Sequence, residues 1–384
     1  MASIQYIDKP EQLAKLCVQI KNEPWLALDT EFLREKTYYP KFCLLQIAAP
    51  GWSACVDPLV LPSMDEVFEA IYNTSILKVF HSCRQDLEIF FQITGKIPEP
   101  IFDTQIAAPL LGYQDNAGYA MLVSSLLNIN LNKAHTRADW SKRPLNEAQI
   151  QYAVDDVIYL CQIYQLIEQK LTELGRRDWL KKDFAELTNP DYYQVAPENA
   201  WLKIKGKNKL TGRQLSIVQT LAEWREKTAQ AEDRPKSWLL RDELLFDMAK
   251  LQPETLTDLT EIRGISERLV NRYGKELCRL IIKAKDRSPI PLNENGKSIK
   301  KTQQQEAILD ILTALVRIRA EENSLNPSIL ATRKDLEGLM FNGNDQSQLL
   351  HGWRFDMAGR DLIGLLHGEQ YLGIESDKLA IIEK

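Results

Sequence analysis

The chain of 384 residues is 44% hydrophobic and 26% charged, and it carries a formal net charge of −5 at pH 7. This length exceeds one ordinary hydrophobic core and predicts two or three domains. No apolar run approaches the roughly 20 residues that cross a membrane, and the N-terminus lacks a secretion signal. The 6 cysteines include no CxxC pair. Neither a disulfide framework nor a zinc site is therefore expected, and the expected compartment is the reducing cytoplasm.

Strand and helix patterns alternate over residues 1–188. Short β-rich apolar runs predict strands at 25–29, 42–48, 53–57 and 76–80. Helical patterns predict helices at 64–72, 83–93, 104–111 and 147–174. Asn146 suits the N-cap of the long helix, and Gly175 suits its end. Strands that precede helices in this order predict an α/β domain with a mixed sheet covered by helices.

Two helical units are expected after the sheet. The expected divisions are a linker at 189–212, an all-α domain at 213–286, a linker at 287–302 and a second all-α domain at 303–376. Residues 221–250 align with 315–340 as a faint internal repeat, in which Arg241 lies over Arg333.

Charge is distributed unevenly along the chain. Residues 1–190 carry 18 Lys and Arg against 24 Asp and Glu, whereas residues 263–287 carry eight basic and three acidic residues. An acidic domain beside a basic one suits catalysis on metal ions next to contacts with a phosphate backbone. A solvated surface is the alternative for charge bias alone. The basic residues expected to contact a substrate are Arg263, Arg268, Arg272 and Lys275.

Two carboxylates end the first predicted strand. Asp29 and Glu31 are two residues apart, so their side chains project from the same face. Burying apolar neighbours around two acids is costly unless a cation or a donor compensates. Taken alone, the pattern also fits an ordinary strand end followed by a turn.

A third acid lies near the start of the helix at 83–93. Ser82 and Gln85 resemble a capping box, which places Asp86 in the second turn of that helix. Asp103 has the position of an N-cap for the helix at 104–111, and it is not expected to bind metal.

The long helix contributes a tyrosine and a fourth acid. Tyr152 and Asp156 are four residues apart and share one face of the helix. A separate stripe suits the core, namely Ile150, Val154, Val157, Cys161 and Tyr164. Asp155 points about 100° away from Asp156 and is expected to face solvent or to play a supporting role. A helix of this kind can line a cleft.

The combination is more specific than its parts. Asp29, Glu31, Asp86 and Asp156 would repel one another if they came together without a counter-charge. Hard divalent cations remove that repulsion, and oxygen ligands without His or Cys select Mg²⁺ or Mn²⁺. Two such ions can stabilise the attacking and leaving oxygens of a phosphoryl displacement.

These motifs resemble those of the ribonuclease D family in the DEDD exonuclease superfamily, in the subgroup with a Tyr in its third motif. The matching segments are DTEFLREKTYYP (29–40), FHSCRQDLEIF (80–90), DTQIAA (103–108), RADWSKRPL (137–145) and QYAVDDVIYL (151–160). Residues 213–285 resemble the domain shared by RecQ-type helicases and ribonuclease D. Residues 303–373 resemble a diverged second copy that lacks an equivalent of IRGISERLVNRYG.

The resemblance implies a ribonuclease-H-like catalytic fold and a 3′→5′ exoribonuclease. Such an enzyme hydrolyses RNA from a free 3′-OH end and releases nucleoside 5′-monophosphates. Precursor transfer RNA and other small structured RNAs follow as substrates from the resemblance alone. A monomer without membrane contact is expected.

The resemblance also implies roles for individual residues. Asp29, Glu31 and Asp156 would hold one ion, and Asp29 with Asp86 would hold the second. Tyr152 would orient the attacking water. The weaker expectations for contact with the terminal nucleotide are Thr30, Phe32 and Gln46.

Two alternatives from other classes stay open at this point. A DNA 3′→5′ exonuclease uses the same ions and carboxylates and differs by a 2′-OH contact that the sequence does not show. A non-catalytic RNA-binding protein is expected to lack a metal carboxylate, and none is missing. Because the four acids precede residue 185, a fragment ending near Asn189 is expected to keep the chemistry.

Overall fold

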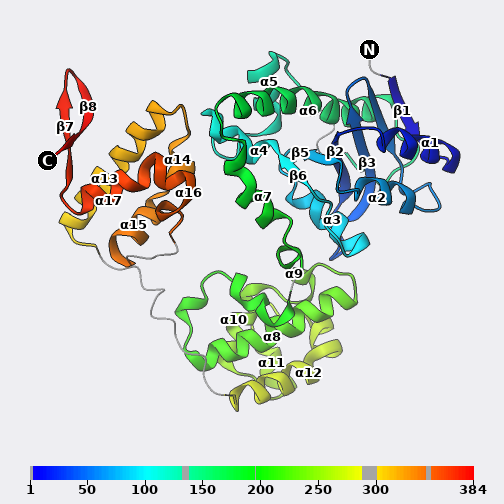
Figure 1. Ribbon diagram of the computed structural model, residues 1–384. Helices are drawn as coiled ribbons and strands as arrows, with labels where there is room; N and C mark the ends of the chain where they lie inside the picture. The colour runs from blue at the N-terminus through cyan, green and yellow to red at the C-terminus, as the bar shows by residue number, and fades with distance from the viewer. Residues whose placement is uncertain (1–2, 132–137, 195, 288–300, 343–346) are drawn as a thin grey trace.

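The computed structural model describes residues 3–131, 138–194, 196–287, 301–342 and 347–384. A six-stranded sheet covered by helices forms the first part, and two helical units follow it (Figure 1). The strand order is β1-β4-β3-β2-β5-β6; β3 is antiparallel to β2 and β4, and the other neighbouring strands are parallel. The mixed α/β sheet expected from the sequence is confirmed.

The strands are β1 (Ser3–Ile7), β2 (Trp25–Leu33), β3 (Lys41–Ala49), β4 (Trp52–Val56), β5 (Leu77–Phe80) and β6 (Ile101–Asp103). The four predicted strands correspond to β2, β3, β4 and β5. The apolar runs do not predict β1 and β6, which are the short strands at the two edges of the sheet. β1 is partly exposed, and β6 has only three residues, the last of which is an acid, so neither strand has a continuous apolar run.

The helices of the sheet domain are α1 (Pro10–Ile20), α2 (Asp65–Ile71), α3 (Arg84–Thr94), α4 (Thr104–Ala107), α5 (Tyr119–Leu127), α6 (Glu147–Glu173) and α7 (Lys181–Leu187). All four predicted helices are present, and a 3₁₀ turn at Ala108–Leu111 continues α4. Three helices, α1, α5 and α7, are not predicted by the sequence patterns. The apolar residues of α1 nevertheless have helical spacing, since Leu13, Leu16, Cys17 and Ile20 are buried.

The first helical unit begins earlier than expected. The segment 189–212 contains three short 3₁₀ helices, and it buries Ala200, Ile204 and Leu210 in the core of this unit. The unit continues with α8 (Gly212–Ala231), α9 (Lys236–Leu239), α10 (Asp242–Leu251), α11 (Leu256–Thr260) and α12 (Glu267–Lys285). Most of the second expected linker, residues 288–300, lies outside the described residues.

The second helical unit ends in a β-hairpin. Its helices are α13 (Gln303–Glu322), α14 (Pro327–Leu330), α15 (Arg333–Asn342), α16 (Gly352–Arg354) and α17 (Arg360–Leu366), with a π-helical turn at Phe355–Gly359. The strands β7 (Gln370–Glu375) and β8 (Lys378–Glu383) then depart from the all-α expectation for 303–376 and cross its boundary. Ser376 and Asp377 have φ of 49° and 64°, as a two-residue hairpin turn requires.

The structure supports the internal repeat and corrects its register. The helices α8 and α13 have 20 residues each, α9 and α14 have 4, and α10 and α15 have 10. Asp233 and Ser324 occupy the same turn with φ of 46° and 49°. Since α10 begins at Asp242 and α15 at Arg333, Arg333 corresponds to Asp242 and not to Arg241.

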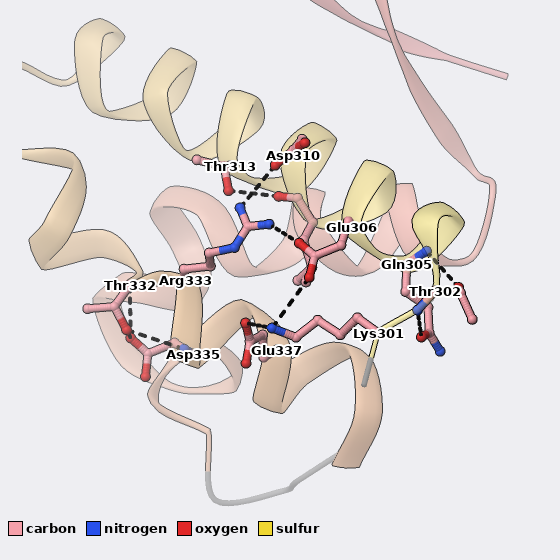
Figure 2. A network of polar contacts seen from close by, with 11 residues as sticks. Lys301, Thr302, Gln305, Glu306, Asp310, Thr313, Thr332, Arg333, Asp335 and Glu337 are labelled. Carbon is pink, nitrogen blue, oxygen red and sulfur yellow. Dashed lines mark hydrogen bonds and ion pairs between the residues drawn. The ribbon is translucent and has the colours of Figure 1, made fainter. Parts of the chain in front are cut away.

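Acids neutralise the basic residues at one end of the second unit (Figure 2). Arg333 contacts Asp310 at 3.0 Å and Glu306 at 2.5 Å. Lys301 pairs with Glu337 and lies 3.7 Å from Glu306. This network leaves little excess positive charge for a phosphate backbone, in keeping with the missing basic segment.

The two helical units contact the sheet domain in different ways. The buried core of the second unit is continuous with that of the sheet domain, whereas the first unit has a core of its own. The first unit is held by polar contacts: the Asp233 carboxylate accepts hydrogen bonds from the backbone N–H groups of Tyr38 and Tyr39, both at 3.0 Å. The Tyr38 hydroxyl also donates to the buried Glu226 at 2.5 Å. No described helix is long and apolar enough to cross a membrane.

Candidate active site

Strand β2 presents the first two acids. Asp29 lies at the centre of this strand, which continues past the predicted end at residue 29, and a register shift just beyond Glu31 interrupts the pairing with β3. Asp29 is in register with Gln46 of β3. Directly paired residues project from the same face of a sheet, so Gln46 lies beside Asp29. The Gln46 side chain is fully buried, and its amide atoms bond to no described residue.

Asp86 lies in the first turn of α3, one turn earlier than the expected capping box implies. Ser82 has φ of 63° and does not cap the helix. The Asp103 carboxylate instead holds the two residues that precede α3, because it accepts hydrogen bonds from the backbone N–H of Ser82 at 3.0 Å and of Cys83 at 2.8 Å. Asp103 also caps α4 by accepting from Gln105 N–H, as expected.

Thr30 joins β2 to α3. Its hydroxyl donates a hydrogen bond of 2.5 Å to Asp86 Oδ1, and both side chains are buried. The contact fixes the rotamer of Asp86 relative to the strand that carries Asp29. The structure thus gives Thr30 an intramolecular partner, which the sequence does not reveal because the two residues are 56 positions apart.

Helix α6 brings Tyr152 and Asp156 to the same place. Asn146 caps it as expected, in a reciprocal capping box with Gln149. Val154, Val157, Cys161 and Tyr164 of the predicted stripe are buried, and Ile150 is partly buried. On the other face, the Tyr119 hydroxyl donates to the backbone carbonyl of Asp156, which anchors the helix at this turn.

A cavity of about 200 Å³ lies between these elements. The residues that line it are Asp29, His81, Tyr119, Tyr152, Asp156 and Leu160. The sequence motifs did not single out His81 and Tyr119, although His81 begins the HSCRQD segment. The His81 ring lies 5.3 Å from the Tyr119 ring, and its Nδ1 is 2.9 Å from Thr104 Oγ1.

The four acids share one electrostatic environment. Burial raises the pKa of Asp29, and the charge of Asp156 raises it further. Burial and then the charge of Asp29 raise the pKa of Asp86, and the same two causes raise that of Glu31 to about 9. The pKa of Asp156 rises to about 7 through burial and then the charge of Asp155. A bound divalent cation relieves this kind of strain by supplying the missing positive charge.

The donor chemistry fits hard cations. Four carboxylates offer oxygen ligands of the kind that Mg²⁺ and Mn²⁺ prefer. Within the described ranges, no three acidic, His or Cys side chains enclose an ion by themselves. Water and substrate oxygens would therefore have to complete the coordination, which is usual for Mg²⁺.

The remaining predicted contacts divide into two groups. Thr30, Phe32 and Gln46 lie on the two strands that carry or flank the acids. The four predicted basic residues lie in the first helical unit, away from this cavity: Arg263, Arg268, Arg272 and Lys275. All four are exposed. Arg272 differs from the others because it is paired with Glu232 at 2.7 Å.

Comparison with known proteins agrees with this division of the chain. A family model described as a 3′-5′ exonuclease matches residues 4–172, which contain all four acids and Tyr152. A model of the HRDC domain matches residues 214–281. Fold and site therefore define a 3′→5′ exonuclease that carries an HRDC domain. Enzymes with this exonuclease domain generally use divalent metal ions.

Full-length relatives narrow the class. Ribonuclease D of Jannaschia sp. (strain CCS1) is 36% identical over 391 residues, covering 98% of this chain and 99% of the relative. The crystal structure of Escherichia coli RNase D superposes with a TM-score of 0.79 and 30% identity, covering 95% of this chain and 99% of that one. The chain belongs to the ribonuclease D family, and it is a 3′→5′ exoribonuclease.

Proposed function

We propose that the chain trims small structured RNAs, precursor transfer RNA among them, by hydrolysis assisted by two divalent ions. The observation that carries this proposal is the set of four carboxylates with raised pKa values, two of which, Asp29 and Asp156, line one cavity. The solved E. coli relative is described as an exoribonuclease involved in structured RNA processing. The products would be nucleoside 5′-monophosphates.

The proposal assigns each acid to one or both of the two metal ions. Asp29, Glu31 and Asp156 would hold one ion after their side chains close around it, since they do not enclose an ion as they stand, and Asp29 with Asp86 would hold the other. Bound Mg²⁺ or Mn²⁺ would supply Lewis acidity at the scissile phosphate. The Tyr152 hydroxyl would orient the attacking water towards that phosphate. Thr30 would keep Asp86 in its rotamer through their short hydrogen bond.

The terminal nucleotide would lie beside β2 and β3. Gln46 is next to Asp29 and its amide has no described partner, but the side chain is fully buried and does not line the cavity, so it would have to move to reach the nucleotide. An unsatisfied buried amide costs free energy that a hydrogen bond to a ligand can offset. Phe32 is only partly buried and would contact the nucleotide from the end of the strand.

We further propose that the chain acts as a monomer in the cytoplasm. All six cysteines are free and buried, which suits a reducing compartment. The basic unit and the acidic cavity belong to the same chain, so a second copy is not needed to bring them together.

The state of the RNA 3′ end tests the proposed function. With Mg²⁺ or Mn²⁺, the chain should release 5′-monophosphates one at a time from an oligomer with a 3′-OH. A 3′-phosphate should block release, because its charge and bulk would occupy the space beside the carboxylates. End-labelled RNA with either terminus, a matched DNA oligomer and a circular RNA can be compared with and without EDTA. Efficient cutting of the circle would identify an endonuclease and refute the proposal.

Salt dependence tests the basic surface of the first helical unit. Arg263, Arg268 and Lys275 make no ion pair with any described residue, so they are available to phosphates. Each phosphate contact on single-stranded RNA contributes a slope of roughly −0.7 to log K against log[salt]. Replacing these three by Gln should therefore make the slope shallower by about 2. Arg272→Gln is the matched control and should change the slope less, because Glu232 already neutralises Arg272. Equal slopes in the triple variant and the unaltered chain would contradict this role.

A further inference from the structure

The segment between residues 138 and 146 leads into α6 and packs against the strands beside the cavity. Trp140 is 3% exposed, and it belongs to a small core with residues of β3, β4 and α6. The members of this core are Cys43, Leu44, Cys55, Trp140, Leu145, Ala153 and Val154. This core is separate from the main core of the sheet domain, and it lies on the side of α6 that carries Tyr152.

Arg143 makes the densest set of hydrogen bonds in this segment. Its Nε donates to Asp57 Oδ2 at 2.5 Å, and its Nη2 donates to Asp57 Oδ1 at 2.8 Å and to the Cys43 carbonyl at 2.6 Å. Its Nη1 donates to the carbonyls of Trp140 and Lys142, both at 2.7 Å. A guanidinium has five N–H groups. All five are used, so Arg143 ties the segment to β3 and to the residue after β4.

The surroundings of Asp57 favour its ionised form, which pairs with the Arg143 guanidinium. Its side chain is fully buried, and it also accepts hydrogen bonds from the Tyr6 hydroxyl and from Leu59 N–H. Burial acts to raise the pKa of Asp57, but the hydrogen bonds from Arg143 and Tyr6 outweigh it and lower the pKa. A bidentate pair between a guanidinium and a carboxylate has a defined orientation, which an ammonium group does not reproduce.

Trp140, whose carbonyl accepts a hydrogen bond from Arg143, contacts the tyrosine that is proposed to be catalytic. The Trp140 ring lies 6.0 Å from the Tyr152 ring at an interplanar angle of 37°. Arg143 fixes the backbone of Trp140 through its carbonyl, and the buried surroundings fix the ring. Tyr119 also bonds to the carbonyl of Asp156. The turn of α6 that carries Tyr152 and Asp156 is thus held by contacts from two other segments.

We propose that Arg143 is a positioning residue for hydrolysis, which sets the location of the Tyr152 hydroxyl through Trp140. This inference rests on the proposed role of Tyr152 in orienting water. The Asp57–Arg143 pair anchors the segment that contains Trp140. The Trp140 ring packs against the Tyr152 ring and so restricts where the Tyr152 hydroxyl lies relative to the attacking water. A displacement of about 1 Å in such a contact can reduce turnover by roughly 100-fold.

The test is a double-mutant cycle with steady-state kinetics on an RNA oligomer. Arg143→Lys keeps a positive charge beside Asp57 but cannot make five hydrogen bonds. It should lower kcat by roughly 10- to 100-fold with little change in KM, because Arg143 is not among the residues proposed to contact RNA. Tyr152→Phe should lower kcat by roughly 100-fold. In the Tyr152→Phe background, Arg143→Lys should cost less than about two-fold more, because the hydroxyl that it positions is absent.

A second variant covers the case in which Arg143→Lys does not fold, as judged by circular dichroism and thermal unfolding. Trp140→Leu keeps both residues of the ion pair and replaces the buried ring that contacts Tyr152 by a smaller apolar side chain. Trp140→Leu should lower kcat when Tyr152 is present and should have little further effect on kcat in the Tyr152→Phe background. The matched control is Arg177→Lys at the other end of α6, where Arg177 pairs with Glu168 at 2.8 Å. Its kcat should stay within roughly two-fold of the unaltered chain.

The outcomes separate the two proposals. If Arg143→Lys and Trp140→Leu lower kcat equally in both backgrounds, their effects are independent of Tyr152 and the inference is overturned, while the proposed function stands. A harmless Tyr152→Phe overturns the role of Tyr152 and this inference with it. Failure of the unaltered chain to release monophosphates from a 3′-OH end would overturn the proposed function itself.

Discussion

Asp29→Asn should lower the rate of RNA hydrolysis by several orders of magnitude and leave the fold intact. Asp29 is the acid proposed to contact both ions, and an amide oxygen is a weaker ligand without a negative charge. The measurement is single-turnover release of monophosphate at saturating Mg²⁺. Asp178→Asn is a matched control, because the Asp178 side chain is 75% exposed in a surface turn. Turnover of Asp29→Asn near that of the control would refute the proposed metal site.

The same substitution should stabilise the metal-free protein at neutral pH. The pKa of Asp29 is raised in the folded state, so its ionised form opposes folding once the pH exceeds the pKa of the unfolded chain, about 4. Asn removes that cost. The unfolding temperature of Asp29→Asn should therefore exceed that of the unaltered chain at pH 7, and the difference should shrink as the pH falls towards 4. Added Mg²⁺ should reverse the order, because only the intact site gains from binding.

Local signals explain why the acidic residues could be predicted from the sequence. Asn146 and Gln149 form a capping box that defines the start of α6, and the spacing of Tyr152 and Asp156 then determines their common face. Asp29 and Glu31 follow from the alternation of a strand in the same way. These rules act over a few residues, and a single sequence displays them directly.

The supporting residues depend on contacts between distant segments. Thr30 bonds to Asp86, and Asp103, on another strand, bonds to the two residues that precede α3. Tyr119 lies on α5, whose sequence YAMLVSSLL is apolar on most faces and gives no clear helical period. Such partners become visible only when the sheet order is known, because that order places β5 beside β2 and β6 beside β5.

The packing of the second helical unit against the sheet domain could not be predicted from the sequence either. The sequence of α13 predicts an apolar helical face, but it does not predict which part of the protein that face packs against. The structure places Leu309, Leu312 and Leu315 in one continuous core with the sheet domain. The expectation that a fragment ending near Asn189 keeps its chemistry therefore needs revision, since that fragment would lose part of its own core.

Removing residues 301–384 should destabilise the sheet domain strongly, although no active-site acid is lost. The buried Arg176 donates to the Leu110 carbonyl at 2.7 Å and to the Asn323 carbonyl at 2.5 Å, so it bridges the two parts. Asn326 adds two hydrogen bonds, from its backbone N–H to the Pro109 carbonyl at 3.1 Å and from its side chain to the Tyr113 carbonyl at 3.0 Å. Truncation would leave these groups and the adjoining apolar surface exposed to water. The truncated chain should unfold at a much lower temperature and lose activity even on short oligomers.

A single substitution tests the contact between the second unit and the sheet domain without deleting any residues. The rings of Trp179 and Trp353 stack across the same contact, with centroids 4.5 Å apart and planes within 2°. Trp353→Ala should cost about 2 kcal/mol from lost apolar burial and the ring contact, which lowers the unfolding temperature by several degrees. Trp238→Ala is the control in the first unit, where the ring is 56% exposed, and its cost should stay within about 0.5 kcal/mol. Equal unfolding temperatures for Trp353→Ala and Trp238→Ala would mean that the stacked pair contributes little. An unfolding temperature of the truncated chain equal to that of the full chain would mean that the second unit does not brace the catalytic domain.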